Sequence, residues 1–177
     1  MDALPEKVSQ WSRRIAVEID PDYEPLAPMY LAAYLRGGNE RRQLFEQVAT
    51  VGGVAAGGGR SLLPYAFAVV SGIAAQAARL CGGGGLALLS DLLTLWKNWL
   101  ELVQVQKDSA ETADASRDKP DELMALRRVL ATVQRELAQQ GLPVEQCELI
   151  TFRVMKALLD RPEEAAELLT LFRDGTS

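Results

Sequence analysis

The sequence predicts an all-α fold, a helical bundle of about seven or eight helices around a central apolar helical hairpin. Three observations predict this class. Apolar residues recur at spacings of three and four along most of the chain, which is the period of one helix face. Prolines beside acidic residues, and glycines, stand where these periodic segments begin and end. Between Glu46 and Asp91 the only charged residues are Arg60 and Arg79, so this stretch is apolar enough to form the centre of the bundle.

The segment before the apolar stretch predicts three short helices. Apolar residues spaced by four, three and four indicate an amphipathic helix, and they are Leu4, Val8, Trp11 and Ile15. The two prolines within residues 20–25 are expected to interrupt regular structure, because proline disfavours the helical conformation of the residue before it. A second helix is expected over residues 25–35, ending at Gly37 and Gly38. Asn39 is the expected N-cap of a third helix that runs into the apolar stretch.

Glycines divide the apolar stretch into three pieces. Residues 52–59 are glycine-rich, and the sequence leaves open whether they form a loop or a closely packed helix. A helical glycine costs roughly 1 kcal/mol relative to alanine, but it also lets two helix backbones approach closely. Residues 61–78 carry no charge and predict one apolar helix; after a four-glycine turn, residues 86–106 predict a second, with its polar residues on one narrow stripe. Residues 61–106 are therefore the expected hairpin.

A polar segment separates this hairpin from the end of the chain. Residues 108–119 predict a linker between residues 1–107 and a set of amphipathic helices in residues 120–177, which we expect to pack on the same unit. Pro120 and Pro162 stand beside acidic residues in the pattern of helix starts, and the same pattern accounts for Glu164 and Glu167. The expected apolar stripes are Leu123, Leu126, Leu130, Val133 and Leu137; then Val144, Cys147, Ile150, Val154 and Leu158; and finally Leu168, Leu171 and Phe172.

Several classes of chemistry lack their residues in this chain. There is no histidine, which excludes Ser-His-Asp and Cys-His catalysis and removes the commonest transition-metal ligand. Cys81 and Cys147 form no CxxC pair, so we expect free thiols in a reducing compartment. The net charge of −5 comes without a basic stripe, which argues against nucleic acid as a partner. We therefore expect a protein that is not an enzyme and has no cofactor or metal site.

Surplus apolar surface is the functional signal that remains. The expected function is an α-helical protein–protein interaction or oligomerisation module, with a second copy of the chain or another subunit of an assembly as its partner. The alternative is a membrane-active effector, with lipid as partner, whose hairpin inserts into a bilayer and oligomerises there. Residues 61–78 reach roughly 27 Å, just enough for a thin hydrocarbon core, while Pro64 and Gln76 oppose insertion.

The first function predicts a cytoplasmic protein, and the alternative predicts association with a membrane. No apolar signal-peptide segment is visible at the start of the chain. Both functions use the apolar stretch, and the first also uses the stripe of the helix that follows the linker. The expected contact residues are Gly53, Gly57, Leu62, Phe67, Val70, Trp96, Trp99, Leu126, Leu130 and Val133.

Overall fold

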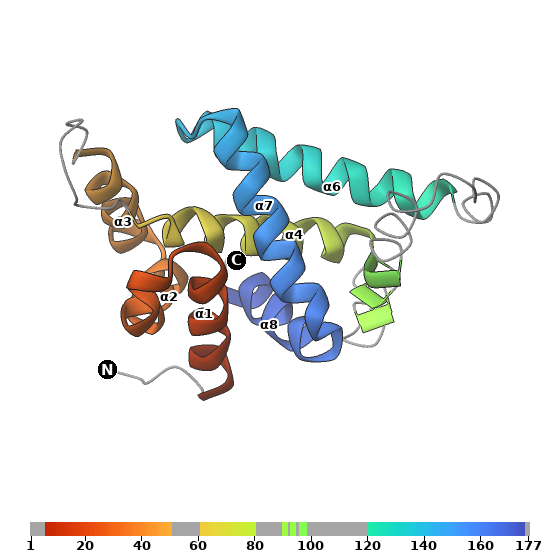
Figure 1. Cartoon of the computed structure of the whole chain (residues 1–177), viewed down its shortest axis with the longest axis horizontal. Helices are drawn as coiled ribbons and strands as arrows, with labels where there is room; N and C mark the ends of the chain where they lie inside the picture. The colour runs from red at the N-terminus through yellow and green to blue at the C-terminus, as the bar shows by residue number, and fades with distance from the viewer. Residues whose placement is uncertain are drawn as a thin grey trace.

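The computed structural model describes residues 6–50, 61–80, 120–175 and, in part, 90–98. These residues form helices and contain no strand, which confirms the all-α class (Figure 1). Eight helices are delimited in them, in the predicted range. In chain order they are α1 (Glu6–Ile19), the 3₁₀ helix η1 (Pro21–Leu26), α2 (Ala27–Arg36), α3 (Gly38–Thr50), α4 (Leu63–Leu80), α6 (Pro120–Gln139), α7 (Val144–Asp160) and α8 (Pro162–Gly175).

The apolar helix α4 is the centre of the bundle, as predicted. It contacts α1, α2, α6, α7 and α8, and Figure 1 shows it running through the middle of the molecule with α6 above and α8 below. Phe67 and Val69 are both fully buried although they lie on nearly opposite sides of the helix axis. A helix with so wide an apolar face is stable only when other helices cover that face, and the exposed positions of α4 include Ala75 and Arg79.

The second arm of the predicted hairpin is described only between residues 90 and 98. Its described residues are helical, and Leu93 and Trp96 are buried while Thr94 is exposed. This alternation agrees with the predicted division into a wide apolar face and a polar stripe. The glycine-rich residues 52–59, the four-glycine turn and the predicted linker at 108–119 all lie outside the described residues.

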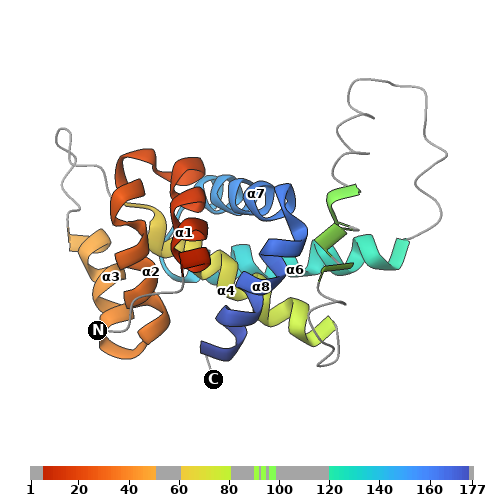
Figure 2. The ribbon, with the colours of Figure 1, turned by 90° about the horizontal axis from the view of Figure 1, so that it is seen from below.

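The helices before and after residues 108–119 share one core. α1 contacts α7, and α4 contacts all three C-terminal helices. A continuous cluster of buried apolar side chains accordingly extends from Val8 on α1 to Phe172 on α8. Figures 1 and 2 both place α1, α2 and α3 at one end of the molecule, with α6 extending toward the other end.

An aromatic cluster fixes α2, α3, α4 and α8 relative to one another. The ring of Tyr34 on α2 lies 6.0 Å from the ring of Phe67, 6.0 Å from that of Phe172 and 6.5 Å from that of Phe45, measured between centroids. Arg41 donates a hydrogen bond to the hydroxyl of Tyr34, and its guanidinium carbon lies 4.1 Å from the centroid of that ring. The buried phenol thus has a polar partner, which a buried hydroxyl needs if its burial is not to be destabilising.

Two local predictions near the N-terminus were wrong. Residues 21–26 form the short 3₁₀ helix η1, so the two prolines separate the α-helices α1 and α2 without ending regular structure. Pro21 stands in the first turn of η1, where a missing N–H breaks no hydrogen bond, and Pro25 lies inside it. Asn39 is not an N-cap: α3 begins at Gly38, and Arg41 N–H donates to the carbonyl of Gly37 at 3.2 Å. Gly37 has a φ of 69°, a conformation that ends α2. Its carbonyl also accepts the first hydrogen bond of α3.

The end of α6 follows the predicted glycine signal. Gly141 has a φ of 87°, Leu142 N–H donates to the carbonyl of Leu137 at 3.3 Å, and Gly141 N–H donates to that of Ala138 at 3.0 Å. This pair of bonds is the Schellman motif, which requires a left-handed residue at the position of Gly141. The apolar stripe predicted for α7 is buried except at Val144, which is 65% exposed; Val144 is the first residue of the helix and extends beyond the neighbours that cover the rest.

Candidate protein-interaction groove

The structure places most of the predicted contact residues inside the bundle. Phe67, Val70, Trp96, Leu126 and Val133 are buried, and Leu62 and Leu130 are partly buried and packed against the same core. Gly53, Gly57 and Trp99 lie outside the described residues. The described members of the set therefore hold the chain's own helices together, whereas the contact role of Gly53, Gly57 and Trp99 stays a prediction.

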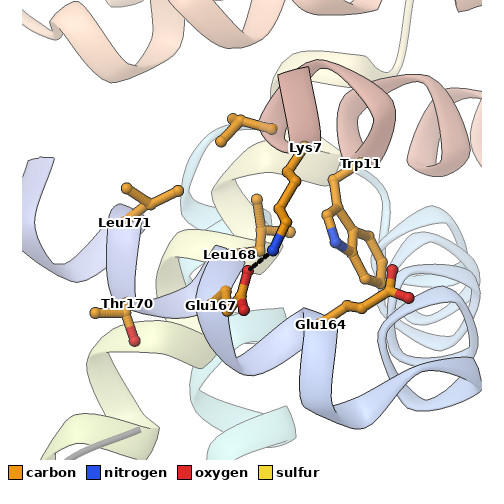
Figure 3. Close-up of a pocket in the computed structure, with 8 residues that line it drawn as sticks. Lys7, Trp11, Glu164, Glu167, Leu168, Thr170 and Leu171 are labelled. Atoms are coloured by element: carbon orange, nitrogen blue, oxygen red, sulfur yellow. Dashed lines mark hydrogen bonds and ion pairs between the residues drawn. The ribbon is translucent and has the colours of Figure 1, made fainter. Parts of the chain in front are cut away.

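A groove of about 380 Å³ runs between α1 and α8, far apart in sequence but side by side in the fold (Figure 3). We call it the α1–α8 groove. The apolar side chains of Val8 and Trp11 on α1, and of Leu168 and Leu171 on α8, form most of its wall. Its complete lining is Lys7, Val8, Trp11, Glu164, Glu167, Leu168, Thr170 and Leu171.

Helical periodicity brings these residues onto two facing surfaces. On α8, Glu164, Glu167, Leu168 and Leu171 follow at spacings of three, one and three, which places them on one side of the helix. Trp11 and Leu168 are nearly fully buried, whereas Leu171 is 42% exposed at the mouth of the groove. The base of the groove is thus part of the rigid core, and its mouth is open to solvent.

Ion pairs cross the groove from one helix to the other. Lys7 Nζ lies 3.0 Å from Glu167 Oε2, and Figure 3 shows this side chain reaching across the gap. Arg14 lies 3.7 Å from Glu164, whose carboxylate is also 3.1 Å from Arg161. Exposed pairs of this kind contribute roughly 0–1 kcal/mol each. They therefore contribute little to the stability of the fold.

A second, polar pocket of about 250 Å³ adjoins the groove. It shares Lys7, Trp11, Glu164 and Glu167 with the groove and adds Gln10, Arg14 and Arg161. The guanidinium carbon of Arg14 lies 4.8 Å from the centroid of the Trp11 ring, so the indole forms the boundary between the apolar wall and the charges. We call this pocket the cationic end of the groove, because three cationic side chains there face two carboxylates.

A second exposed apolar feature lies on α7. Leu149 and Phe152 are 47% and 53% exposed, although most other large apolar side chains of the described residues are buried. The exposed residues Glu145 and Glu148 each stand four positions before one of them, on the same side of the helix. We call Glu145, Glu148, Leu149 and Phe152 the α7 ridge. Neither carboxylate of this ridge forms an ion pair with any other residue that the structure describes.

Sequence reasoning missed the groove. The sequence pattern assigned Glu164 and Glu167 to a helix start only. It placed Trp11 on the apolar stripe of a helix, and it did not indicate which other helix Trp11 faces. One usable signal was present: Lys7, Trp11 and Arg14 are spaced by four and three, so an indole lies between two cations on one helix face.

Within the described residues, no group of three or more cysteine, aspartate or glutamate side chains could hold a metal ion, and no helix is long and apolar enough to cross a membrane. Comparison of the chain with protein-family models, with curated proteins and with solved structures finds no match to any of them.

Proposed function

We propose that this chain is a non-enzymatic interaction module that binds a helical segment of a protein in the α1–α8 groove. The observation that carries the proposal is the combination of an apolar wall with a charged rim between two fixed helices. Amphipathic helices are recognised by such grooves, which take apolar anchors spaced by three or four residues and leave the polar rim in water.

The groove is supported from beneath by the core. Trp11 is 5% exposed and Leu168 is 1% exposed, and Phe172, one turn beyond Leu168, belongs to the aromatic cluster around Tyr34. A surface held in this way loses little conformational entropy when a partner arrives, which favours binding. The space is large enough for one or two anchor side chains. On its own it should support a weak contact, since stable interfaces bury about 800 Å² on each partner.

Site-specific photo-crosslinking tests the proposal. The photoreactive residue p-benzoylphenylalanine replaces Leu171 at the mouth of the groove or, as a control, Met124 on α6, which is 51% exposed and lies outside the groove. Illumination in the cells that make the protein should give discrete adducts from position 171 that are absent from position 124. Mass spectrometry of these adducts should identify cross-linked peptides with apolar residues three or four positions apart.

Two results would contradict the proposal. If positions 171 and 124 give the same adducts, the groove has no selectivity over an ordinary exposed apolar residue. If position 171 gives no protein adduct at any expression level, while the purified variant retains its helical circular dichroism spectrum, the groove binds no protein segment.

A further inference from the structure

We infer that the segment bound in the α1–α8 groove is the α7 ridge of a second copy of this chain. The inference rests on the proposed function and names its partner. Two independent properties of the ridge match the groove: its exposed apolar side chains and its carboxylates, which form no ion pair with another described residue.

The apolar match concerns Leu149 and Phe152. They are three positions apart on one face of α7, the spacing of anchors in a helix that binds a groove. About half of each side chain is exposed. Leu171, which is 42% exposed at the mouth of the groove, provides an apolar surface beside which such anchors would lose contact with water, and the nearly fully buried Trp11 and Leu168 form the base beneath it.

The charge match concerns the acidic half of the ridge and the cationic end of the groove. Arg14 and Arg161 share the single carboxylate of Glu164, and the 3.7 Å separation of Arg14 from it exceeds hydrogen-bonding distance. Glu145 and Glu148 have no cationic partner among the described residues. The cationic end holds three cations and two carboxylates, so it has one positive charge in excess. An incoming acidic ridge would supply a counter-charge to it, in a protein whose net charge of −5 otherwise opposes self-association.

The basic residues near the ridge do not compete for these carboxylates. Lys156, the next cation on that side of α7, lies 3.5 Å from Glu18 on α1, and Arg153 donates to the carbonyl of Glu18 at 3.1 Å. These contacts keep both cations at the α1 junction of the same molecule. The acidic end of the ridge remains available to another copy.

The groove and the ridge are different surfaces, so one copy offers its ridge while the other offers its groove. Such a contact is heterologous, and each surface can be damaged separately. A copy with a damaged groove still has an intact ridge, and a copy with a damaged ridge still has an intact groove. Mixing the two defective forms should therefore restore one complete contact.

Sedimentation velocity of the full chain tests this directly, from about 10 µM to 1 mM, the range of weak contacts. Phe152→Asp damages the ridge, Leu171→Asp damages the groove, and Met124→Asp is the matched control, because all three side chains are about half exposed on helices. We expect the wild type and Met124→Asp to self-associate alike. Phe152→Asp and Leu171→Asp should each weaken self-association by about tenfold or more. An equimolar mixture, with one variant labelled with fluorescein at its N-terminus, should recover a one-to-one heterodimer. Raising the salt from 50 to 500 mM should weaken it.

The inference is overturned if the wild type stays monomeric at 1 mM, if the three variants behave alike, or if the mixture does not recover association. The crosslinking experiment distinguishes a failure of this inference from a failure of the proposed function. Adducts from position 171 that contain only another protein would reject the second copy as the partner but leave the groove as a binding site. Adducts that join position 171 of one copy to residues 145–156 of a second copy would support both the groove as a binding site and the second copy as its partner.

Discussion

Replacement of Gly72 by alanine tests the packing at the centre of the bundle. A Cβ atom added to Gly72 on α4 would lie 2.9 Å from Cγ2 of Val133 on α6 and 3.6 Å from the carboxylate of Glu136. The first distance is shorter than carbon atoms tolerate. Val133 is buried, and the branched side chain of a helical valine has one strongly preferred rotamer. The two helices therefore have to move apart to admit the methyl group.

Two opposing effects set the magnitude. Overpacking a close contact costs about 1–3 kcal/mol, whereas replacing a helical glycine by alanine stabilises a helix by about 1 kcal/mol. We expect Gly72→Ala to lower the free energy of unfolding by about 1 kcal/mol, which corresponds to roughly 2–4 °C in Tm for a chain of this size. Ala75→Gly, at an exposed position of the same helix, calibrates the propensity effect and should cost about 1 kcal/mol.

Urea unfolding of four variants isolates the contact. Val133→Ala alone should cost about 2 kcal/mol, because it removes buried methyl groups. In the double variant the new methyl of position 72 occupies space that Val133 has vacated, so the two costs should not add. The coupling free energy of the cycle should be about 1–2 kcal/mol. If Gly72→Ala instead stabilises the protein by as much as Ala75→Gly destabilises it, the close approach of α4 and α6 is refuted.

Three further predictions concern the same fold. Tyr34→Phe removes the hydroxyl that receives a hydrogen bond from Arg41, and it should lower the free energy of unfolding in urea by about 1–2 kcal/mol; an unchanged value would show that this bond contributes nothing. Gly141→Ala should cost about 1–2 kcal/mol in the same assay from backbone strain alone, because φ is 87° and no atom lies within 4 Å of the added methyl; a neutral effect would contradict the Schellman end of α6. Burial raises the pKa of Asp20 above its usual value, although the hydrogen bond from Leu62 N–H, at 3.3 Å, opposes this. The folded state therefore binds the proton of the Asp20 carboxyl more tightly than the unfolded state does. This proton binding stabilises the folded state at low pH, and the stabilisation is lost as the pH rises through the folded-state pKa. The stability of the wild type relative to Asp20→Asn should thus fall as the pH rises from below the usual pKa of an aspartate, and a constant difference would refute the raised pKa.

Much of the architecture could be predicted because it depends on local signals. The stripe of Val8, Trp11 and Ile15 is buried as its spacing predicts, and Gly141 ends α6 as its place in the pattern predicts. The sequence of α4 also predicted its central position, since a helix with so wide an apolar face has to be covered by other helices. These outcomes follow from helical periodicity and backbone conformation, which a few adjacent residues determine.

The candidate site could not be predicted in the same way. Phe67 and Leu126 are large apolar residues of the kind expected at a protein–protein interface, but both side chains are buried against neighbouring helices of the same chain. Conversely, Leu171 belongs to an apolar stripe and nevertheless stays half exposed. A stripe indicates which side of a helix is apolar, but not how far the neighbouring helix covers it.

The sequence by itself determined the all-α class, the apolar centre and most helix boundaries, because each depends on spacing along the chain. Only the tertiary structure decided that Lys7 meets Glu167 and that Arg14 meets Glu164. Those pairs join segments about 150 residues apart, and an exposed charge on a single helix has many possible partners of opposite sign. The choice among them is made by the packing of α1, α4 and α8 on a common core, and the groove exists because that packing leaves the mouth between α1 and α8 uncovered.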